Sequence, residues 1–202
     1  YMGPLELGQV LNLRGPHAAP GGSPTYFALR PLEKFPRLLD KIGVPDEAIE
    51  QIVPDLKELR VGKLLKYSQD NFMVMASLGI CARAQINRFY YADLYPELYA
   101  AATGIEKTRE EILRCGERIY NLLKLANIRE GHKTRDRLPD QWFTEPRFQE
   151  YTGKGELTKE EVEKMLDEYY EERGWSKETG IPTRQKLIEL GLQEELKSLG
   201  EL

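Results

Sequence analysis

DNFMVMASLGICAR, residues 70–83, is the stretch of sequence that decides the fold of this chain. Residues 72–76 within it are all apolar, so a helix formed here has no polar face to turn toward water. The sequence therefore predicts one helix from Lys63 to about Ala76 that enters the core. Gly79 follows the apolar run, and a glycine at that point lets the backbone turn or approach another group closely.

Cys81 follows Gly79 by two residues, and two interpretations of it stay open on the residues alone. A free cysteine is usually a small buried core side chain. A buried helix that ends in a glycine turn and a thiol can also present one ligand to a metal cluster. The second cysteine, Cys115, belongs to no CxxC pair, and we interpret it as a packing residue in a helix.

The sequence pattern of the rest of the chain predicts helices joined by turns, and therefore an all-α, irregular multi-helix fold. Two sequences typical of capping boxes, Thr108 with Glu111 and Thr158 with Glu161, mark the starts of two of these helices. Glycines at positions 43, 104, 174 and 191 mark helix ends. The helices are expected near residues 31–42, 46–53, 63–76, 94–103, 109–126, 159–173 and 184–190.

The domain organisation follows from the distribution of glycine and proline. Residues 1–31 contain ten of them and are expected to be a Gly/Pro-rich loop segment, at most partly ordered. Residues 32–202 are expected to be a single all-helical domain. The opening Tyr1-Met2-Gly3-Pro4 is not a natural start, so we expect the chain to be a piece of a longer protein.

The composition of the chain limits the classes of molecule that it is expected to bind. The 202 residues carry 29 basic and 33 acidic side chains, a net charge of −4 that gives no reason to expect nucleic acid. A cluster of tyrosines at residues 89–99 could stack on single-stranded nucleic acid, but core packing is favoured because no basic groove accompanies it. No apolar run is long enough to span a membrane. Two cysteines make no disulfide framework, which favours a cytoplasmic protein.

His17 is the notable side chain of the first segment. It follows Asn12-Leu13-Arg14-Gly15-Pro16 and could act as an acid, a base or a ligand. It could equally be an exposed loop histidine.

Several motifs resemble those of the tungsten-containing aldehyde ferredoxin oxidoreductases, in the same order along the chain. Residues 77–81 resemble the end of the family motif Asp-x-x-Gly-Leu-Cys, with Ile80 in place of Leu and Ala76 in place of Asp. Arg14-Gly15 followed by His17 is similar to an Arg-Gly-x-x-His segment of that family, one residue shorter. The resemblance spans residues 12–192, and its other matching segments are 116–121, 127–131, 136–139, 166–175 and 180–184.

The resemblance implies the last, all-helical domain of that family, ending at a natural C-terminus. It implies that Cys81 ligates a 4Fe-4S cluster, that Ser77, Leu78, Gly79 and Ile80 lie against a tungsten or molybdenum pyranopterin, and that His17 assists proton transfer. The parent enzyme would convert aldehydes to carboxylic acids with ferredoxin as electron acceptor. The expected partners are the N-terminal domains of the parent, ferredoxin, a small aldehyde or acid, and a second copy of the chain.

The isolated piece is expected to be inactive and to bind none of these cofactors, because one cysteine cannot hold a cluster that needs four ligands. Two alternatives remain. The parent could act on aromatic acyl-CoA thioesters, since alanine at position 76 cannot accept hydrogen bonds from a pterin. The chain could also be a non-catalytic helical interaction module.

Overall fold

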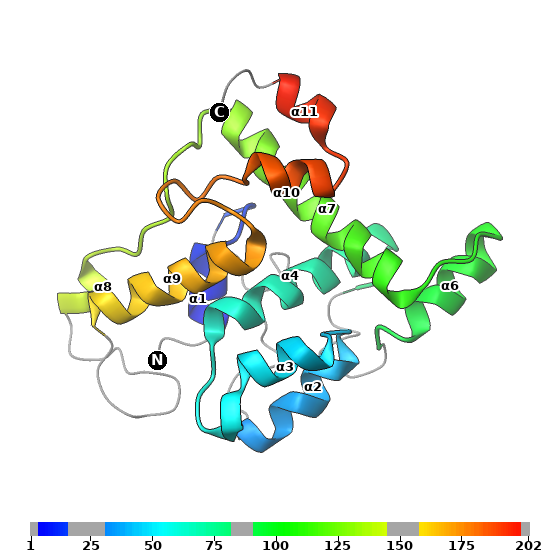
Figure 1. The fold of residues 1–202 in the computed structure, drawn as a ribbon, viewed down its shortest axis with the longest axis horizontal. Coiled ribbons are helices and arrows are strands. Elements are labelled where there is room, and N and C mark those ends of the chain that lie inside the picture. The colour runs from blue at the N-terminus through cyan, green and yellow to red at the C-terminus, as the bar shows by residue number, and fades with distance from the viewer. Residues whose placement is uncertain (1–3, 16–30, 82–90, 145–157, 199–202) are drawn as a thin grey trace.

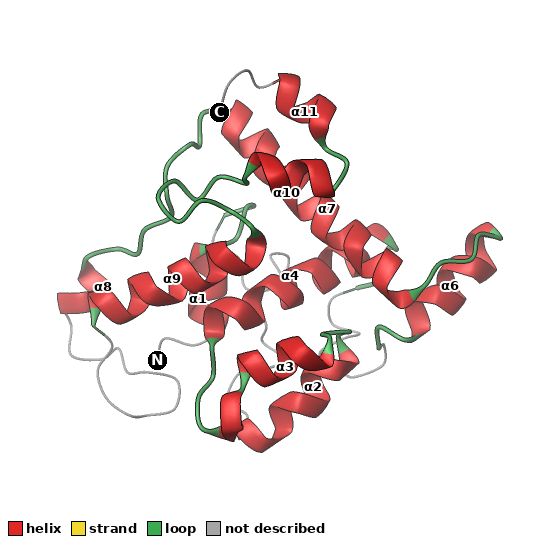
Figure 2. Ribbon diagram, in the orientation of Figure 1, coloured by secondary structure: helices red, strands yellow, loops and turns green. Residues whose placement is uncertain are grey.

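The computed structural model describes residues 4–15, 31–81, 91–144 and 158–198. Every regular element in these ranges is a helix, and the extended pairing found there is an isolated bridge between Trp175 and Pro182 (Figure 2). The all-α fold expected from the sequence is therefore confirmed. The helices are α1 (Pro4–Val10), η1 (Leu32–Lys34), α2 (Phe35–Lys41), α3 (Asp46–Ile52), η2 (Pro54–Leu56), α4 (Val61–Ser77), α6 (Leu94–Thr103), α7 (Arg109–Arg129), α8 (Gln141–Thr144), α9 (Lys159–Arg173), α10 (Arg184–Glu189) and α11 (Gln193–Ser198).

Helix α4 lies at the centre of the molecule, with α1, α3, α7 and α9 packed against it (Figure 1). Its apolar side chains Phe72, Met73, Val74 and Met75 are all at most 8% exposed, which confirms the predicted core helix. The buried run ends one residue earlier than expected, because Ala76 is exposed.

Two glycines allow the long helices to meet at backbone distance. A Cβ added to Gly62 of α4 would lie 2.2 Å from the carbonyl oxygen of Met165 in α9. A Cβ added to Gly116 of α7 would lie 2.2 Å from the carbonyl oxygen of Asp70 in α4. Since no side chain fits in either gap, glycine is required at both contacts.

Both predicted capping boxes are present. The hydroxyl of Thr108 accepts a hydrogen bond from the Glu111 amide at 3.2 Å, and the Glu111 carboxylate accepts one from the Thr108 amide at 2.8 Å. Thr158 and Glu161 form the same pair of bonds at the start of α9. Each box satisfies two amides that have no partner inside the helix.

Among the described residues, three α-helices were not expected from the sequence, α1, α8 and α11, and neither was the short 3-10 helix η2. Helix α1 lies inside the segment expected to be a loop, and Leu7 and Leu11 at this end of the chain are buried in the main core. Pro4 is tolerated there because it stands at the first helical position, where its missing N–H costs nothing. The glycines and prolines at positions 16–30 lie outside the described residues.

A polar layer crosses the core between α4 and α9. The guanidinium of Arg173, which is 0% exposed, pairs with the Asp70 carboxylate and donates to the Gln69 side chain at 2.7 Å. It also lies 4.0 Å from the ring centroid of Tyr120 and donates to the Tyr169 hydroxyl at 3.2 Å. Burial opposes the charge of Arg173, but the Asp70 carboxylate and the hydroxyls of Tyr169 and Tyr120 together outweigh it, so the pKa of Arg173 is raised.

The polar layer continues to the surface through a chain of ion pairs. Lys66 lies 3.2 Å from the second oxygen of Asp70, an ion pair without hydrogen-bond geometry, and 3.5 Å from Glu117 of α7. Glu117 in turn pairs with Lys186 of α10 at 3.2 Å. These contacts tie α4, α7, α9 and α10 together across the same level of the core.

Candidate functional site

The segment that carries the family-like motif forms the C-terminal cap of α4. The amide of Ile80 donates to the carbonyl of Met75 at 2.8 Å, and the amide of Gly79 donates to the carbonyl of Ala76 at 3.2 Å. These two bonds, with Gly79 at φ +72°, define a Schellman motif. The turn that the sequence predicted at Gly79 is therefore present, and its backbone conformation favours glycine. No atom of the described residues lies within 4 Å of a Cβ added to Gly79, so the requirement for glycine is conformational.

The capped end of α4 is open to solvent. Ala76, Ser77, Gly79 and Cys81 are exposed, while Ile80 packs beside Met75 in a small apolar cluster. Cys81 is a free, exposed thiol in this chain, so its interpretation as a buried core side chain is wrong. The capped end of α4 thus presents an exposed face that includes Ser77 and is followed by the exposed thiol of Cys81.

A small apolar hollow, which we call the α4–α7 hollow, adjoins this face. Its volume is about 170 Å³, and Ser77 and Leu78 of the cap contribute to its lining. Cys115 of α7 also lines it and is exposed, so the interpretation of Cys115 as a packing residue is wrong. Cys115 lies on the same face of α7 as Ile112 and Ile119. Helix α6 leaves this part of the face uncovered, which the sequence alone cannot show. Tyr99 is the residue of α6 that reaches the hollow.

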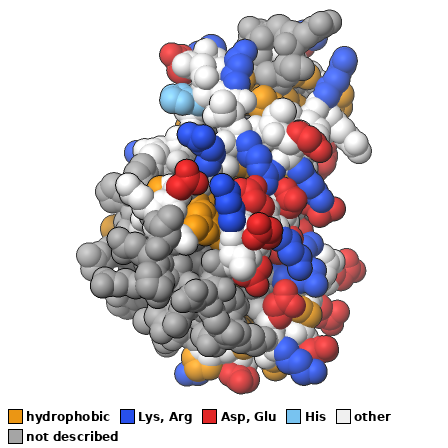
Figure 3. All heavy atoms as spheres, turned by 90° about the vertical axis from the view of Figure 1, so that its left-hand side faces the viewer, with side chains coloured by type: hydrophobic (Ala, Val, Ile, Leu, Met, Phe, Trp, Pro, Cys, Tyr) orange, Lys and Arg blue, Asp and Glu red, His pale blue; other side chains and the backbone are white. Residues whose placement is uncertain are grey.

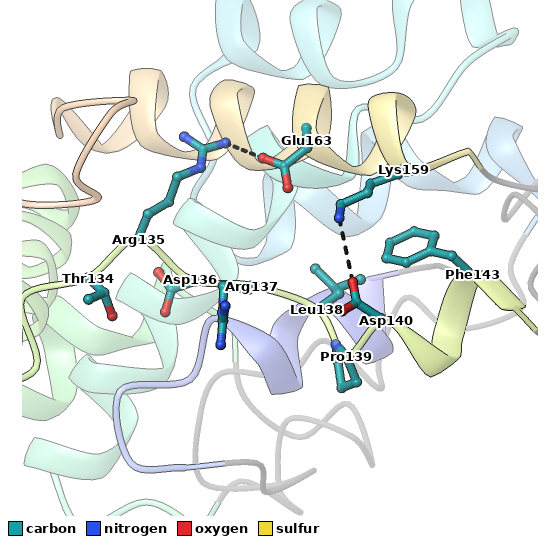
Figure 4. Close-up of a pocket in the computed structure, with 10 residues that line it drawn as sticks. All are labelled: Thr134, Arg135, Asp136, Arg137, Leu138, Pro139, Asp140, Phe143, Lys159 and Glu163. Carbon is teal, nitrogen blue, oxygen red and sulfur yellow. Dashed lines mark hydrogen bonds and ion pairs between the residues drawn. The ribbon is translucent and has the colours of Figure 1, made fainter.

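A larger hollow, which we call the loop pocket, lies between the segment that follows α7 and the first turns of α9 (Figure 4). Its volume is about 690 Å³, and residues 134–140 form one side of it. The segment includes residues 136–139, one of the stretches that carry the family resemblance. On the face shown in Figure 3, the described lysine and arginine side chains alternate with aspartate and glutamate, and they form no broad patch of one sign.

Of the predicted site residues, the structure brings Ser77, Leu78, Gly79, Ile80 and Cys81 together in one cap. His17 lies outside the described residues. Within the described residues, no group of three or more His, Cys, Asp or Glu side chains is placed to hold a metal ion. The single exposed thiol of Cys81 therefore fits one ligand position of an iron–sulfur cluster, whose other ligands would have to come from outside these residues.

The cap residues offer few polar groups that could bind a pterin. The backbone amides of Gly79 and Ile80 are used in the cap, and Ala76 offers no polar side-chain atom. Ser77 is the residue of the cap with an exposed hydroxyl. Any side-chain hydrogen bond from the cap to a pterin would therefore come from Ser77.

The sequence reasoning missed Arg173 altogether. A basic residue in the last turn of a helix normally faces solvent and complements the helix dipole. A signal was nevertheless present, since Val162, Leu166, Tyr169 and Arg173 follow the i, i+4, i+7, i+11 spacing of a single stripe. All four of these side chains are buried.

Among the described residues, no helix combines the length and the apolar character that a membrane crossing requires.

Comparison with known proteins identifies similar sequences. A family described as aldehyde ferredoxin oxidoreductase, domains 2 and 3, matches residues 24–192. The tungsten-containing aldehyde ferredoxin oxidoreductase of Pyrococcus furiosus is 36% identical over 134 residues, which are 65% of this chain and 21% of the relative. The protein of the same description from Pyrococcus horikoshii is 30% identical over 162 residues, 79% of this chain and 24% of the relative. The chain thus spans less than a quarter of the length of these relatives.

A solved structure shares the fold. It is described as the active site complex BamBC of benzoyl coenzyme A reductase in complex with 1,5 dienoyl-CoA, and it matches with a TM-score of 0.58. The alignment covers 85% of this chain and 27% of that chain at 23% identity, so the likeness supports the fold alone.

Proposed function

Because this chain belongs to the aldehyde ferredoxin oxidoreductase family, we propose that it is the C-terminal helical part of a tungsten-pterin, iron–sulfur oxidoreductase. The matching family model spans domains 2 and 3, and the assignment of residues 32–202 to one domain is part of this proposal. The observation that carries the proposal is the exposed thiol of Cys81, which directly follows the rigid cap of the central helix.

Three groups of this chain have proposed roles. The thiolate of Cys81 would be one ligand of a 4Fe-4S cluster, with the other ligands supplied by the rest of the parent protein. Residues 77–80 would lie against the pyranopterin, with the Ser77 hydroxyl as the polar contact. His17 would accept or donate a proton near the reacting carbonyl group. The tungsten centre and the cluster, when bound, would supply the two-electron oxidation and carry the electrons onward.

The proposed reaction converts an aldehyde and a water molecule to a carboxylic acid, two protons and two electrons. The electrons would pass to two molecules of ferredoxin, each accepting one. The isolated chain would be inactive, because it lacks the other cluster ligands. Its two free cysteines support a reducing, cytoplasmic setting.

The exposed cap supports docking of the remaining parent domains onto this face. The α4–α7 hollow beside the cap is lined mostly by apolar side chains and also by Lys107, and exposed apolar patches mark interaction sites. An unpartnered chain would instead use this face to associate with a second copy of itself.

A second candidate reaction keeps the family and changes the substrate to an aromatic acyl-CoA thioester. Ala76 favours it, because this exposed residue stands where the aldehyde-oxidising relatives of the motif carry an aspartate. Assays of the parent enzyme with aldehydes and with aryl-CoA thioesters discriminate the two. The remaining alternative, a non-catalytic helical module, predicts a metal-free product from the complete gene.

The decisive experiment measures iron, tungsten and the visible spectrum of protein produced from the complete natural gene. We expect both metals and a broad brown absorption, and we expect Cys81→Ser to lose the cluster absorption and the activity. Cys115→Ser is the matched control, since it removes the other exposed thiol and should keep both. A colourless, metal-free wild-type protein, or a Cys81→Ser variant with an intact cluster, would contradict the proposal.

A further inference from the structure

The α4–α7 hollow has a volume that suits one side chain better than a free ligand. It measures about 170 Å³, whereas small-molecule sites usually measure about 300–1,000 Å³. A cavity of about 150 Å³ holds one benzene ring. At protein–protein interfaces, small pockets receive single anchor side chains that supply much of the binding energy. The volume therefore favours an apolar side chain of a protein partner.

The walls of the hollow consist mainly of apolar side chains that water still reaches. Leu78 of α4, Tyr99 of α6 and Ile119 of α7 all line it, and each is only half-buried. Val74 and Ile112, which are buried, complete the apolar lining. Covering such surface is favourable in proportion to the apolar area that is removed from water. An anchor side chain would therefore gain binding energy from all three helices.

Helix α6 adds further exposed apolar side chains next to the hollow, and it extends away from the body of the molecule (Figure 1). Tyr95 is its buried residue, and the Tyr95 hydroxyl donates to Asn71 of α4 at 2.7 Å. Leu98, which precedes the hollow residue Tyr99, is 42% exposed. Glu97 is the single charged side chain of α6. This helix therefore presents an apolar surface that a larger partner can cover together with the hollow.

Lys107 is the one charged residue in the lining of the hollow. It is half-buried, and within the described part of the chain no ion pair or hydrogen bond engages its ammonium group. Glu111, one turn along the chain, directs its carboxylate to the Thr108 amide at 2.8 Å, and Glu106 contributes nothing to the lining. Charge complementarity therefore favours a partner with an acidic residue beside the anchor.

The hollow lies beside the part of this chain that the rest of the parent protein is expected to reach. Ser77 and Leu78 of the cap contribute to its lining, and Cys81 follows after Gly79 and Ile80. Under the proposed function, the other ligands of the cluster come to this end of α4 from the rest of the parent. The residues aligned with this chain are only 21% and 24% of the two relatives, so most of such a parent lies outside it.

We propose that the α4–α7 hollow receives one large apolar side chain from the remaining domains of the parent protein, and that an acidic residue beside this anchor pairs with Lys107. The inference rests on the proposed function, because the cluster shared through Cys81 brings those domains to this face. It adds a protein–protein contact that cluster ligation does not itself require. The thiol of Cys115, which lines the hollow and is exposed in this chain, reports whether the hollow is filled.

The first test is alkylation of Cys115 by iodoacetamide in protein from the complete natural gene, followed by peptide mass spectrometry. Each rate is divided by that of the same thiol in urea-unfolded protein. We expect Cys115 to react at least about tenfold more slowly than the thiol introduced by Arg129→Cys, because a docked side chain excludes the reagent until the contact opens. Arg129 is the matched control, since it is exposed on the same helix and does not line the hollow. Equal rates would overturn the proposal.

A charge reversal tests the acidic neighbour of the anchor. Lys107→Glu should raise the alkylation rate of Cys115 by about fivefold, the effect of losing one exposed ion pair. Lys133→Glu is the matched control, because Lys133 is an exposed lysine outside the hollow, and it should leave the rate unchanged. If Lys107→Glu also leaves the rate unchanged, the partner has no acidic residue at this position and the proposed pairing is wrong.

Photo-cross-linking identifies the occupant of the hollow. With 4-azidophenylalanine in place of Tyr99, irradiation of the complete protein should join this position to a peptide from outside these 202 residues. A cross-link to a second copy of this chain, or to another part of the same chain, would overturn the proposal.

The iron content of the same samples separates this inference from the proposed function. A metal-free protein with a protected Cys115 and the expected cross-link would remove the redox function and leave the docking contact. An iron-loaded protein in which Cys115 reacts as fast as the control thiol would remove the docking contact alone.

Discussion

The middle and the C-terminal end of helix α4 are held in place by different kinds of contact. Its middle is held by the Arg173 layer, where Arg173 of α9 pairs with Asp70 and Gln69 of α4, and Gly116 of α7 touches its backbone. Its C-terminal end is exposed and is held by two backbone bonds of the cap. The stabilising contacts of α4 therefore lie in its middle turns, and the exposed thiol of Cys81 lies just beyond its C-terminal end. Changes in the middle should destabilise the chain most, and changes to the exposed side chains of the cap should have less effect on folding.

The largest effect should come from Arg173→Ala. The substitution leaves the buried Asp70 carboxylate with Lys66 alone and removes the cation between the rings of Tyr120 and Tyr169. Removing one partner of a buried ion pair costs about 3–5 kcal/mol of unfolding free energy. Urea unfolding followed by circular dichroism measures it, with Arg184→Ala as the exposed control. A loss of unfolding free energy below about 1 kcal/mol, the typical value of an exposed ion pair, would contradict the expected difference between the middle and the end of α4.

Two glycine substitutions, one in the middle of the fold and one in the cap, should have smaller effects on the unfolding free energy. Gly116→Ala should cost about 1–3 kcal/mol or more, since its Cβ meets the rigid backbone of Asp70 at 2.2 Å. Gly79→Ala should cost only about 1–2 kcal/mol, because the left-handed conformation is strained but the space is open. Chemical denaturation of both variants checks the order. Gly79→Asn, which tolerates this conformation, should recover part of the loss.

The ion pairs at the edge of the layer give a smaller, pH-dependent effect. Burial acts to raise the pKa of Glu117, but Lys66, Lys186 and Arg173 together outweigh it, so the pKa is lowered. A carboxyl whose pKa is lower in the folded state stabilises the protein above its ordinary pKa and loses that contribution as pH falls through the folded value.

Glu117→Gln should therefore reduce the unfolding free energy by about 1 kcal/mol at pH 7, and the difference should shrink toward zero in acid. Urea titrations at pH 7 and at about pH 3, below the ordinary carboxyl pKa, measure it. Glu130→Gln provides an exposed control whose effect should be small at both values. A difference that grows in acid would show that the lysines do not control this group.

The smallest effect on folding should come from Cys81→Ser, even though we expect this variant to lose the iron–sulfur cluster. Exposed substitutions away from special features usually change the unfolding free energy by less than about 0.5 kcal/mol. Comparing the urea midpoints of the wild type and the variant in the metal-free, isolated chain checks it. A large loss of stability would show that the cap region is part of the folding core.

Particular residues show how far sequence reasoning reached. The central helix, both capping boxes and the turn at Gly79 follow from local rules and are confirmed by the structure. The motif led directly to the cap and to Cys81, whose role as a ligand stays a prediction. The exposure of Cys81 and Cys115 could not be predicted, because each depends on which neighbouring helix covers that turn. The burial of Arg173 was missed although its position on the apolar stripe of α9 indicated it.

The sequence by itself determined most of the longer helices and several of their ends. Apolar periodicity, capping residues and glycines act within a few positions of the chain, so they can be read without knowledge of the fold. The tertiary structure alone decided which polar groups meet. Asp70 and Arg173 are 103 residues apart, and Asp136 and Tyr170 are 34 apart. Their pairing depends on helix packing, and the same packing leaves the end of α4 exposed.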